Sequence, residues 1–297
     1  MKEPLVCVIL VNYNGYEDTV ACIQSLRQID YTNYKIIVID NGSTELPSEE
    51  QIQYIKKHSK YVVSDNNLGF SGGNNLGMKI ADTLGADYYM LLNNDTVVDT
   101  KFMTKLVQTA EEKENVGIVT GKIFYYDHPR HIWYAGGEVN SDTCSVRHRY
   151  WDEVDYISDQ EVEQITFATG CLWLLPVKTV KEIGTMDEKL FLYSEDTEYS
   201  FRLIDKGYKI YYNNSAIIYH KVSKSTSILS DIKQYYLLRN EFYIINKYAK
   251  KRYKAFLKKI YVIIKQVLKK ELRIRVVLRA YSDYKNNNMG VFREGWY

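Results

Sequence analysis

Four apolar runs in the first third of the chain are each followed at once by a polar stretch, and this regularity constrains the fold most. The runs cover residues 5–11, 34–39, 61–63 and 88–92. Continuous apolar character of this kind predicts strands that are buried on both faces, as in a parallel sheet. Apolar side chains at helical spacing predict helices between the strands, over residues 16–28, 46–58 and about 76–84. We therefore predict an α/β fold with a mostly parallel, doubly wound sheet.

The polar stretches form the second half of this pattern. They are Asn12-Tyr13-Asn14-Gly15, Asp40-Asn41-Gly42-Ser43, residues 66–75, and Asn93-Asn94-Asp95. Strand ends that are far apart in the chain converge at one edge of a parallel sheet. We therefore expect Asp40, the glycine-rich residues 69–75 and Asp95 to face a single cleft.

Asp95 is the candidate metal ligand. A carboxylate at the end of a central strand is a hard oxygen donor that suits Mg²⁺ or Mn²⁺. The alternative is a strand that runs into an Asx-type turn, which Asn and Asp favour. Asn93-Asn94-Asp95 taken alone favours the turn, and the ordered set of polar stretches favours the metal site.

The glycines at positions 69, 72 and 73 would let a ligand approach the backbone closely, and a helix that starts there offers amide hydrogens to anions. Their spacing differs from the dinucleotide-binding fingerprint, and no Gly-Lys-Ser/Thr follows, as a P-loop requires. The sequence therefore disfavours a dinucleotide-dependent dehydrogenase and a P-loop nucleotidase. The alternative is a glycine-rich helix entry without a ligand.

Composition excludes several classes of protein. The net charge of +2 argues against a nucleic-acid binder. The four cysteines are far apart and have no zinc spacing, which fits a reducing compartment better than a disulfide scaffold. The first residues carry no signal-peptide pattern, and no run of about 18 apolar residues occurs. We expect a cytoplasmic protein, with the inner face of the plasma membrane as its site if it binds lipid.

The ordered polar stretches resemble the inverting GT-A glycosyltransferases, specifically the bacterial rhamnosyltransferase-like branch of family two, over roughly residues 4–227. The resemblance implies a nucleotide-diphosphate sugar donor and a divalent metal ion, Mn²⁺ or Mg²⁺. It implies that Asp40 contacts the base or ribose and that Asp95 matches the last residue of the Asp-x-Asp metal motif, with Asn93 in place of the first. The implied nucleotide-sugar-binding residues are Asn12, Tyr13, Asn14, Asp40, Asn67, Gly69, Gly72, Gly73, Asn75, Asn93 and Asn94.

A second set of candidate residues follows residue 190. Glu195-Asp196 resembles the Glu-Asp motif of the same enzymes, which implies that Asp196 is the catalytic base and that Glu195 binds the acceptor or orients the site. The alternative is a pair of acids that stabilises a helix start. His220 follows an apolar run at 216–219, and in relatives a His at this place completes the metal shell. A lone His in such a position is more often structural.

We predict a catalytic domain over residues 1–227, with a nucleotide-sugar half at about 1–98 and an acceptor half at about 99–227, and a helical extension over 228–297. Residues 247–279 are dense in Lys and Arg, with Glu271 as the sole acid, and apolar residues recur at helical spacing from 256 to 268. A basic amphipathic helix suits an anionic membrane surface. The alternative is a helix that packs on the domain and leaves a basic face in solvent.

The expected function is metal-dependent, inverting transfer of a sugar to a hydroxyl of a cell-surface glycan, such as a cell-wall or capsule polysaccharide, or of a lipid-linked acceptor. By resemblance the leading donor is dTDP-rhamnose, and UDP-galactofuranose and UDP-hexoses are alternatives. A nucleotidyltransferase would carry a basic glycine-rich loop near the start, and residues 11–15 contain no Lys or Arg. An inactive partner protein would have lost a metal or base residue, and Asp95, Asp196 and His220 are all present.

Overall fold

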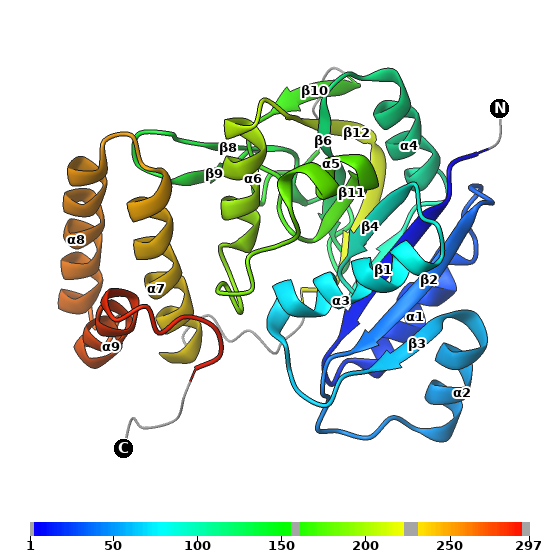
Figure 1. Cartoon of the computed structure of the whole chain (residues 1–297), viewed down its shortest axis with the longest axis horizontal. Helices are drawn as coiled ribbons and strands as arrows, with labels where there is room; N and C mark the ends of the chain where they lie inside the picture. Colours follow the sequence, from blue (N-terminus) through cyan, green and yellow to red (C-terminus); the bar gives the residue numbers. More distant parts are fainter. Residues whose placement is uncertain (1–2, 156–160, 223–230, 293–297) are drawn as a thin grey trace.

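The computed structural model describes residues 3–155, 161–222 and 231–292. Its amino-terminal half is a layer of parallel strands with helices on both faces, and the predicted apolar runs form those strands (Figure 1). The elements are β1 (Val6–Asn12), α1 (Tyr16–Leu26), β2 (Tyr34–Asp40), α2 (Glu49–His58), β3 (Lys60–Val63), α3 (Gly69–Thr83) and β4 (Tyr88–Leu92). The prediction of an α/β fold with a mostly parallel, doubly wound sheet is therefore confirmed.

The order of these strands creates a switch point. The sheet runs β4-β1-β2-β3, and every neighbouring pair in that stretch is parallel. The chain therefore moves outward from β1 to β3 and then returns through α3 to the other side of β1. Ligands of such sheets bind at the carboxyl ends of the strands where the order reverses. The loops after β1 and β4 meet at that place.

The second half of the chain extends the same sheet with strands of both directions. Its elements are β5 (Thr96–Val98), α4 (Phe102–Glu112), β6 (Val116–Tyr125), β7 (Ile132–Tyr134), β8 (Gly137–Val139), β9 (Val146–His148), β10 (Val162–Ile165), β11 (Leu172–Pro176), α5 (Val177–Ile183), α6 (Glu195–Asp205) and β12 (Lys209–His220). Strand β11 is antiparallel to both β4 and β6, whereas β12 runs parallel to β6. Strands β8 and β9 form a separate hairpin.

Two element boundaries differ from the predictions for local reasons. Helix α2 begins at Glu49 rather than at residue 46 because Ser48 caps it in a reciprocal capping box with Gln51. Strand β12 is longer than the predicted run at 216–219. Its first half is rich in Tyr and Asn, and its pairing with β6 shifts register between Asn213 and Ile217.

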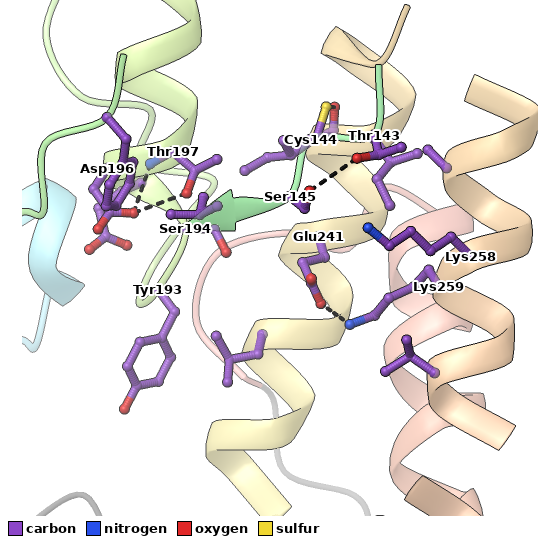
Figure 2. Close-up of a pocket in the computed structure, with 18 of the residues that line it drawn as sticks. Thr143, Cys144, Ser145, Tyr193, Ser194, Asp196, Thr197, Glu241, Lys258 and Lys259 are labelled. Atoms are coloured by element: carbon purple, nitrogen blue, oxygen red, sulfur yellow. Dashed lines mark hydrogen bonds and ion pairs between the residues drawn. The ribbon is translucent and has the colours of Figure 1, made fainter. Parts of the chain in front are cut away.

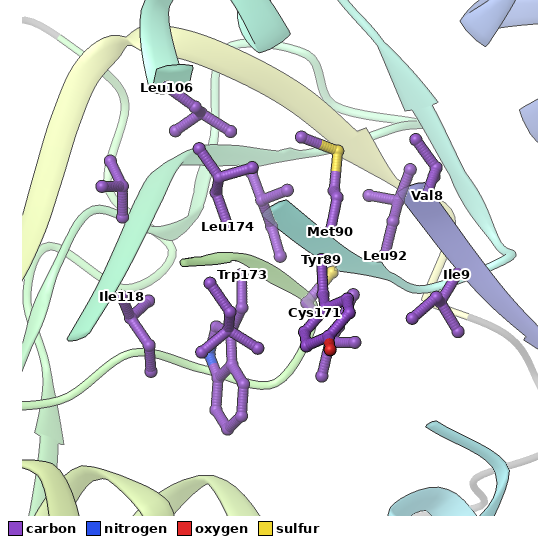
Figure 3. Close-up of a cluster of buried hydrophobic side chains, with 14 of the residues drawn as sticks. Val8, Ile9, Tyr89, Met90, Leu92, Leu106, Ile118, Cys171, Trp173 and Leu174 are labelled. Atoms are coloured by element: carbon purple, nitrogen blue, oxygen red, sulfur yellow. The ribbon is translucent and has the colours of Figure 1, made fainter. Parts of the chain in front are cut away.

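The core lies where β4, β11 and β1 stack their apolar side chains. Figure 3 shows Met90 and Tyr89 of β4 beside Trp173 and Leu174 of β11, all of them buried. Trp173 donates its indole N–H to the carbonyl of Ala168 at 3.2 Å, so its polar atom is paired despite full burial. This packing fixes the edge of the sheet that carries the polar loops.

Three helices follow the sheet: α7 (Asp231–Tyr248), α8 (Arg252–Leu268) and α9 (Ile274–Lys285). The apolar residues at helical spacing from 256 to 268 lie in α8, and the basic segment 247–279 continues past it through a turn at residues 269–273, where Lys270 has a positive φ, into α9. The three helices surround their own apolar cluster, and Figure 1 places them beside the sheet layer. The predicted boundary at 227/228 lies outside the described residues.

Helix α7 contains Arg239, which is fully buried. Its guanidinium lies against the rings of Tyr235 and Tyr236 and donates to the carbonyl of Gly290 at 2.9 Å.

Within the described ranges, none of the helices combines the length and the apolarity that a membrane crossing requires.

Candidate active site

Two cavities meet at Tyr193, and together they contain most of the candidate functional residues. The first, of about 530 Å³, lies at the carboxyl ends of β1 and β4. It is lined by Val11, Tyr13, Asn41, Asn67, Gly69, Phe70, Asn74, Leu92, Asn93, Asn94, Asp95, Phe191, Leu192, Tyr193, Ile232 and Lys233. The structure therefore brings Tyr13, Asn67, Gly69 and the stretch 93–95 together at one cavity.

The amide side chains of the first loops hold those loops to each other. Asn12 accepts at its amide oxygen from the N–H of Gly15 at 3.1 Å and from the hydroxyl of Thr19 at 3.1 Å. Asn94 donates to the same Thr19 hydroxyl at 2.9 Å. Asn14, whose φ is +57°, accepts from the backbone of Thr44 at 2.8 Å. These bonds fix the loops after β1, β2 and β4 relative to each other.

Asp40 is buried, and its carboxylate is already engaged. One oxygen accepts from the hydroxyls of Tyr16 and Tyr61, each at 2.6 Å, and the other accepts from the backbone N–H of Ser43 at 3.0 Å. Burial raises the pKa of Asp40, but these hydrogen bonds outweigh it, and the net pKa lies below the ordinary value. Asp40 is therefore an ionised anchor for the loop that follows β2.

The glycine-rich segment is a helix rather than a loop, because α3 begins at Gly69. A Cβ at Gly73 would lie 2.8 Å from Val11, and a Cβ at Gly72 would lie 2.8 Å from Leu68, so these glycines allow close packing. The N–H groups of Leu68, Gly69 and Phe70 are donated to Asn41, Asn67 and Phe191. The expected anion cradle is therefore not formed by these first amides, which are already paired.

Gly69 and Asn75 connect α3 to the segment before α6. Gly69 has a φ of +73°, and a Cβ there would lie 2.2 Å from the carbonyl oxygen of Phe191. Asn75 donates to the carbonyl of Met186 at 3.0 Å and accepts from its N–H at 3.0 Å. Asn75 and Gly72 line a different, shallow cavity with Glu188, so the structure does not bring them to the first cavity.

Asp95 and His220 form the candidate metal pair. Their side chains are almost buried, and Nε2 of His220 lies 3.1 Å from Oδ1 of Asp95. Strand β12 carries His220 to this place through its pairing with β5, and the ring of Trp133 packs edge-on against it at 4.5 Å. Nδ1 of His220 is buried and has no hydrogen-bond partner in the part of the chain that the structure describes.

This pair fits a divalent ion whose remaining ligands come from a substrate. One carboxylate oxygen and one imidazole nitrogen suit Mn²⁺, and Mg²⁺ at phosphate sites also uses few protein ligands. Over residues 3–155, 161–222 and 231–292, no group of three or more His, Cys, Asp or Glu side chains is arranged to hold a metal. A complete protein cage is therefore not present in those ranges, and Asp95 and His220 are the two potential ligands that lie together.

The second cavity, of about 460 Å³, extends from α6 to α7 and α8. Figure 2 shows Asp196 and Thr197 at one end and Glu241, Lys258 and Lys259 at the other. The remaining lining comes from Thr143, Cys144, Ser145, Val146, His148, Phe167, Tyr193, Ser194, Glu195, Leu237, Ile244, Ile245, Ala255 and Val262. The helices after the sheet therefore supply one wall of this cavity.

Asp196 lies at the first turn of α6, where its carboxylate is held from two sides. Oδ1 accepts from the N–H of Thr197 at 2.7 Å, and Oδ2 accepts from the N–H of Gly170 at 3.4 Å. A Cβ at Gly170 would lie 3.3 Å from Phe70, which lines the first cavity. The base candidate is therefore close to the wall that separates the two cavities.

Glu195 and Asp196 have opposite surroundings. Glu195 is 8% exposed, and its Oε2 has no hydrogen-bond partner among the described residues. Burial, followed by the charge of Asp196, raises the pKa of Glu195 to about 8. Burial also raises the pKa of Asp196, although the bonds from Thr197 and Gly170 oppose this rise. In such a pair the hydrogen-bonded carboxyl is the one that ionises first. Asp196 is therefore the anion, and Glu195 keeps its proton at neutral pH.

The segment before α6 is fixed by α7. Asn240 donates to the carbonyls of Leu192 at 2.9 Å and of Tyr193 at 2.8 Å, and the ring of Phe191 stacks on Tyr236. Both Tyr193 and Ser194 have a φ of +67°. The hydrogen bonds from Asn240 therefore hold an unusual backbone that presents Tyr193 to both cavities.

Sequence reasoning missed four residues that line these cavities. Phe70 and Lys233 lie at the first cavity, Lys258 lies at the second, and Tyr193 lies at both. Phe70 lies within the glycine-rich stretch 66–75, and Tyr193 lies two residues before the Glu195-Asp196 pair. Lys258 was one of many lysines in a basic segment, and no local pattern separates it from the others.

Comparison with family models identifies glycosyl transferase family 2 over residues 7–184. Among curated relatives, the low-salt glycan biosynthesis hexosyltransferase Agl10 of Haloferax volcanii is 24% identical over 202 residues, which are 66% of this chain and 60% of that protein. The dTDP-rhamnosyl transferase RfbF of Shigella flexneri is 22% identical over 251 residues, which are 80% of this chain and 79% of that protein.

Two solved structures share the fold. GalNAc-T7 with UDP, GalNAc and Mn²⁺ has a TM-score of 0.66 at 14% identity, and the match covers 98% of this chain and 55% of that one. The mannosyltransferase PcManGT from Pyrobaculum calidifontis, in complex with GDP-Man and Mn²⁺, has a TM-score of 0.57 at 13% identity, with 83% and 64% covered. The GT-A fold is therefore shared at low sequence identity.

Proposed function

Because the chain belongs to glycosyl transferase family 2, we propose that it is an inverting glycosyltransferase that moves a sugar from a nucleotide-diphosphate donor to a hydroxyl. The observation that carries this proposal is the pair of cavities that meet at Tyr193. One is lined by Asp95, whose carboxylate contacts His220, and the other is lined by Asp196. A donor site and an acceptor site that share a wall are what a direct transfer between two substrates requires.

The first cavity is the proposed donor site. Tyr13, Asn67, Asn93 and Asn94 line it and would face the nucleotide. Asp40, Asn12 and Asn14 support this site by fixing its loops, because their polar groups already bond to protein. Gly72, Gly73 and Asn75 support it by holding α3 in place. Lys233 lies at the same cavity, over the ring of Tyr193, and would add positive charge near a diphosphate.

Asp95 and His220 are the proposed holders of a divalent ion, Mn²⁺ or Mg²⁺. The fit rests on the nearly buried carboxylate–imidazole pair, 3.1 Å apart, whose Asp95 lines the proposed donor cavity. Such an ion would neutralise the negative charge of the diphosphate leaving group. His220 would bind through Nε2, the nitrogen that faces Asp95. Solved neighbours that hold Mn²⁺ with a nucleotide or a nucleotide sugar support this proposal.

Asp196 is the proposed general base. An acceptor hydroxyl is a very weak acid, so a carboxylate takes its proton only while the new bond forms. The hydroxyl oxygen attacks the anomeric carbon, the nucleoside diphosphate departs from the opposite face, and the proton passes to Asp196. One carboxylate is enough for this displacement with inversion. Glu195, which keeps its proton at neutral pH, would donate a hydrogen bond to the acceptor.

The leading donor is dTDP-rhamnose, and the likeness to a dTDP-rhamnosyl transferase over four fifths of both chains supports it. UDP-galactofuranose and UDP-hexoses are the alternatives. The proposed acceptor is a growing surface glycan or a lipid-linked glycan. In this reading, residues 1–227 are the catalytic domain, with a donor half at about 1–98 and an acceptor half at about 99–227, and residues 228–297 are an extension that completes the acceptor cavity.

An anionic membrane is the proposed partner of the extension. Helices α8 and α9 each have one apolar row packed against α7 and a second row exposed to solvent. The second row includes Leu268, which is 78% exposed, and Tyr261, which is 68% exposed. Its other members are Tyr253, Leu257, Ile260, Ile264, Ile274, Leu278 and Tyr281. An exposed apolar row among lysines suits the boundary between lipid headgroups and chains.

Donor binding and donor hydrolysis test the proposed function. Nucleotides such as dTDP and UDP should raise the melting temperature only when Mn²⁺ or Mg²⁺ is present. A screen of nucleotide sugars for slow hydrolysis should then identify the donor. Stabilisation of equal size in EDTA would contradict the metal assignment.

Vesicle flotation tests the membrane contact separately. The protein should float with anionic vesicles and less with neutral ones, and binding should weaken at high salt. Equal flotation with both would show that apolar contact dominates. Absence of flotation would favour a packed helix with a solvated basic face.

A further inference from the structure

The far end of the second cavity carries a positive charge, and the proposed function leaves that charge unexplained. Glu241 and Lys259 form an ion pair across α7 and α8. Lys258 lies beside them and forms no ion pair with any described residue, and Figure 2 shows its amino group turned from α8 toward Ser145 and Glu241. Burial lowers the pKa of His148, so that ring is neutral at physiological pH. Lys258 is therefore the uncompensated cation of this cavity.

The near end of the same cavity contains an oxygen that needs a partner. Glu195 lines the cavity, and its Oε2 is buried and has no hydrogen-bond partner among the described residues. An unpaired buried polar group is unfavourable, and a ligand that hydrogen-bonds to it would remove that cost. The cavity volume of about 460 Å³ lies within the range of small-molecule sites. The cavity is therefore polar at its catalytic end and cationic at its far end.

The wall between these ends is apolar, and it belongs to the helical extension. Helix α8 contributes Ala255, Lys258, Lys259 and Val262, which recur at helical spacing on one face. Leu237, Ile244 and Ile245 of α7 complete this wall. Another side of α8 carries the exposed row that includes Leu257 and Tyr261. Helix α8 therefore stands between the cavity and the proposed membrane surface.

We propose that this cavity binds an acceptor that carries a phosphate, and that Lys258 holds the phosphate. This inference rests on the proposed function and specifies the acceptor class. The acceptor hydroxyl lies at Asp196, Glu195 donates to a neighbouring oxygen of the same sugar, and the phosphate lies at Lys258. A lysine ammonium is a common phosphate ligand that acts as a point charge. The apolar wall beside Lys258 favours a phosphate attached to a lipid over a free phosphorylated glycan.

The test measures binding of three probes by isothermal titration calorimetry at low salt. Octyl phosphate carries both the anion and an apolar chain, octanol carries the chain alone, and inorganic phosphate carries the anion alone. Wild-type protein should bind octyl phosphate more tightly than octanol. Lys258→Gln should weaken binding of octyl phosphate by about 10- to 100-fold, the value of one charge-assisted hydrogen bond, and leave binding of octanol unchanged.

Lys265→Gln is the matched control. It removes one positive charge from the same helix, seven residues further on, where the side chain is exposed and does not line the cavity. It should bind octyl phosphate as wild type does. Equal losses in both variants would mean that the general charge of α8 attracts the probe, and this outcome would overturn the phosphate site. The melting temperature of each variant should match wild type, because Lys258 is also exposed at the helix surface.

The probes also separate the two sources of phosphate. Inorganic phosphate that binds as tightly as octyl phosphate, and depends on Lys258, would keep the phosphate site and overturn its lipid attachment. Donor hydrolysis by the wild-type enzyme provides the separate control for the proposed function. If the enzyme hydrolyses its donor but binds octyl phosphate no better than octanol, the proposed glycosyl transfer stands and the proposed phosphate site is contradicted. If the enzyme hydrolyses none of the donors, the proposed function itself is contradicted.

Discussion

The two cavities, which we propose as the donor cavity and the acceptor cavity, are built in different ways. The donor cavity is surrounded by loops that follow β1, β2 and β4, and amide side chains such as Asn12 and Asn94 bind those loops together. The acceptor cavity is enclosed by the β8–β9 hairpin, α6, α7 and α8, which are far apart in sequence. The first is a property of one parallel sheet, whereas the second depends on how a separate group of helices docks.

Because the two cavities are built from different parts of the chain, substitutions in each part should affect a different proposed substrate. A change at a strand end should alter nucleotide binding, because the loops that line the proposed donor cavity begin there. A change in the helical extension should alter the acceptor and leave the nucleotide in place. The segment 191–194 belongs to both regions, since Phe191 contacts α3 and Asn240 of α7 holds residues 192 and 193.

The largest expected effect is at the donor cavity. Asp95→Ala should reduce transfer by at least roughly 10³-fold, because the leaving diphosphate loses the ion that neutralises it. The Mn²⁺-dependent rise in melting temperature with nucleotide should disappear at the same time. Asp18→Asn is the control, since Asp18 pairs with Lys221, the neighbour of His220, at 2.7 Å, but lies outside the proposed metal pair. An Asp95→Ala enzyme that still responds to Mn²⁺ would contradict the assignment.

Asp196→Asn should act at the acceptor side alone. Turnover should fall by roughly 10²- to 10⁴-fold, the usual range for loss of a general base, while nucleotide affinity stays at its wild-type value. Glu198→Gln provides a contrast on the same helix. Glu198 is buried and bonds to Arg202, Lys247 and Tyr248, so its loss should lower the melting temperature more than the turnover.

Nucleotide affinity and turnover should therefore be compared between Asp95→Ala and Asp196→Asn. If Asp196→Asn turns over at a near wild-type rate, Asp196 only caps α6, and the proposed mechanism is wrong. A capping role would cost about 1 kcal/mol of stability and leave most of the activity.

Asn240→Ala should disturb the segment that joins the two regions. Two carbonyls, those of Leu192 and Tyr193, would lose their donors, which should reduce the free energy of unfolding by roughly 1–3 kcal/mol. Urea unfolding measures this loss. Steady-state kinetics should show a lower kcat as well, because Tyr193 and Ser194 would no longer hold Asp196 in position. A stability loss with unchanged kcat would show that the segment keeps its shape without Asn240.

The last expected effect is the pH dependence of the stability of Glu195→Gln. The pKa of Glu195 is raised from 4.5 to about 8, so the folded protein keeps a proton there that the unfolded chain releases. Stability from this group therefore falls as the pH rises from about 4.5 to about 8. Glutamine does not titrate, so the melting temperature of the variant relative to wild type should increase from pH 5 to pH 9. A constant difference across this range would show that Glu195 titrates normally.

The sequence predicted the donor half of the fold better than its ligand contacts. Parallel strands are buried on both faces, so β1, β2 and β4 stood out as apolar runs. The direction of β11 could not be read in this way, because an apolar run looks the same in either direction. Asn12 and Asn94 were both predicted to contact the nucleotide. Asn12 bonds within its own loop, whereas Asn94 also lines the first cavity, and the local pattern of an Asn does not separate these two cases.

The acceptor half was less predictable because its parts are distant in the chain. Asp196 was recognisable from its motif, and His220 from its place after a strand. Lys258 has no such signal, since its role depends on the docking of α8 beside the β8–β9 hairpin. Composition gives no signal for the turn between α8 and α9, because the basic residues continue through it.

Tyr193 should couple the binding free energies of the two proposed substrates. Its side chain lines both cavities, and its backbone has a φ of +67°. If the bound donor fixes the Tyr193 ring in one position, the acceptor no longer has to order that ring when it binds. The acceptor should therefore bind more tightly to the enzyme that already holds the donor. Linkage requires the effect to be reciprocal, with the same factor in both directions. The two substrates should therefore show synergistic affinities even though they occupy separate cavities.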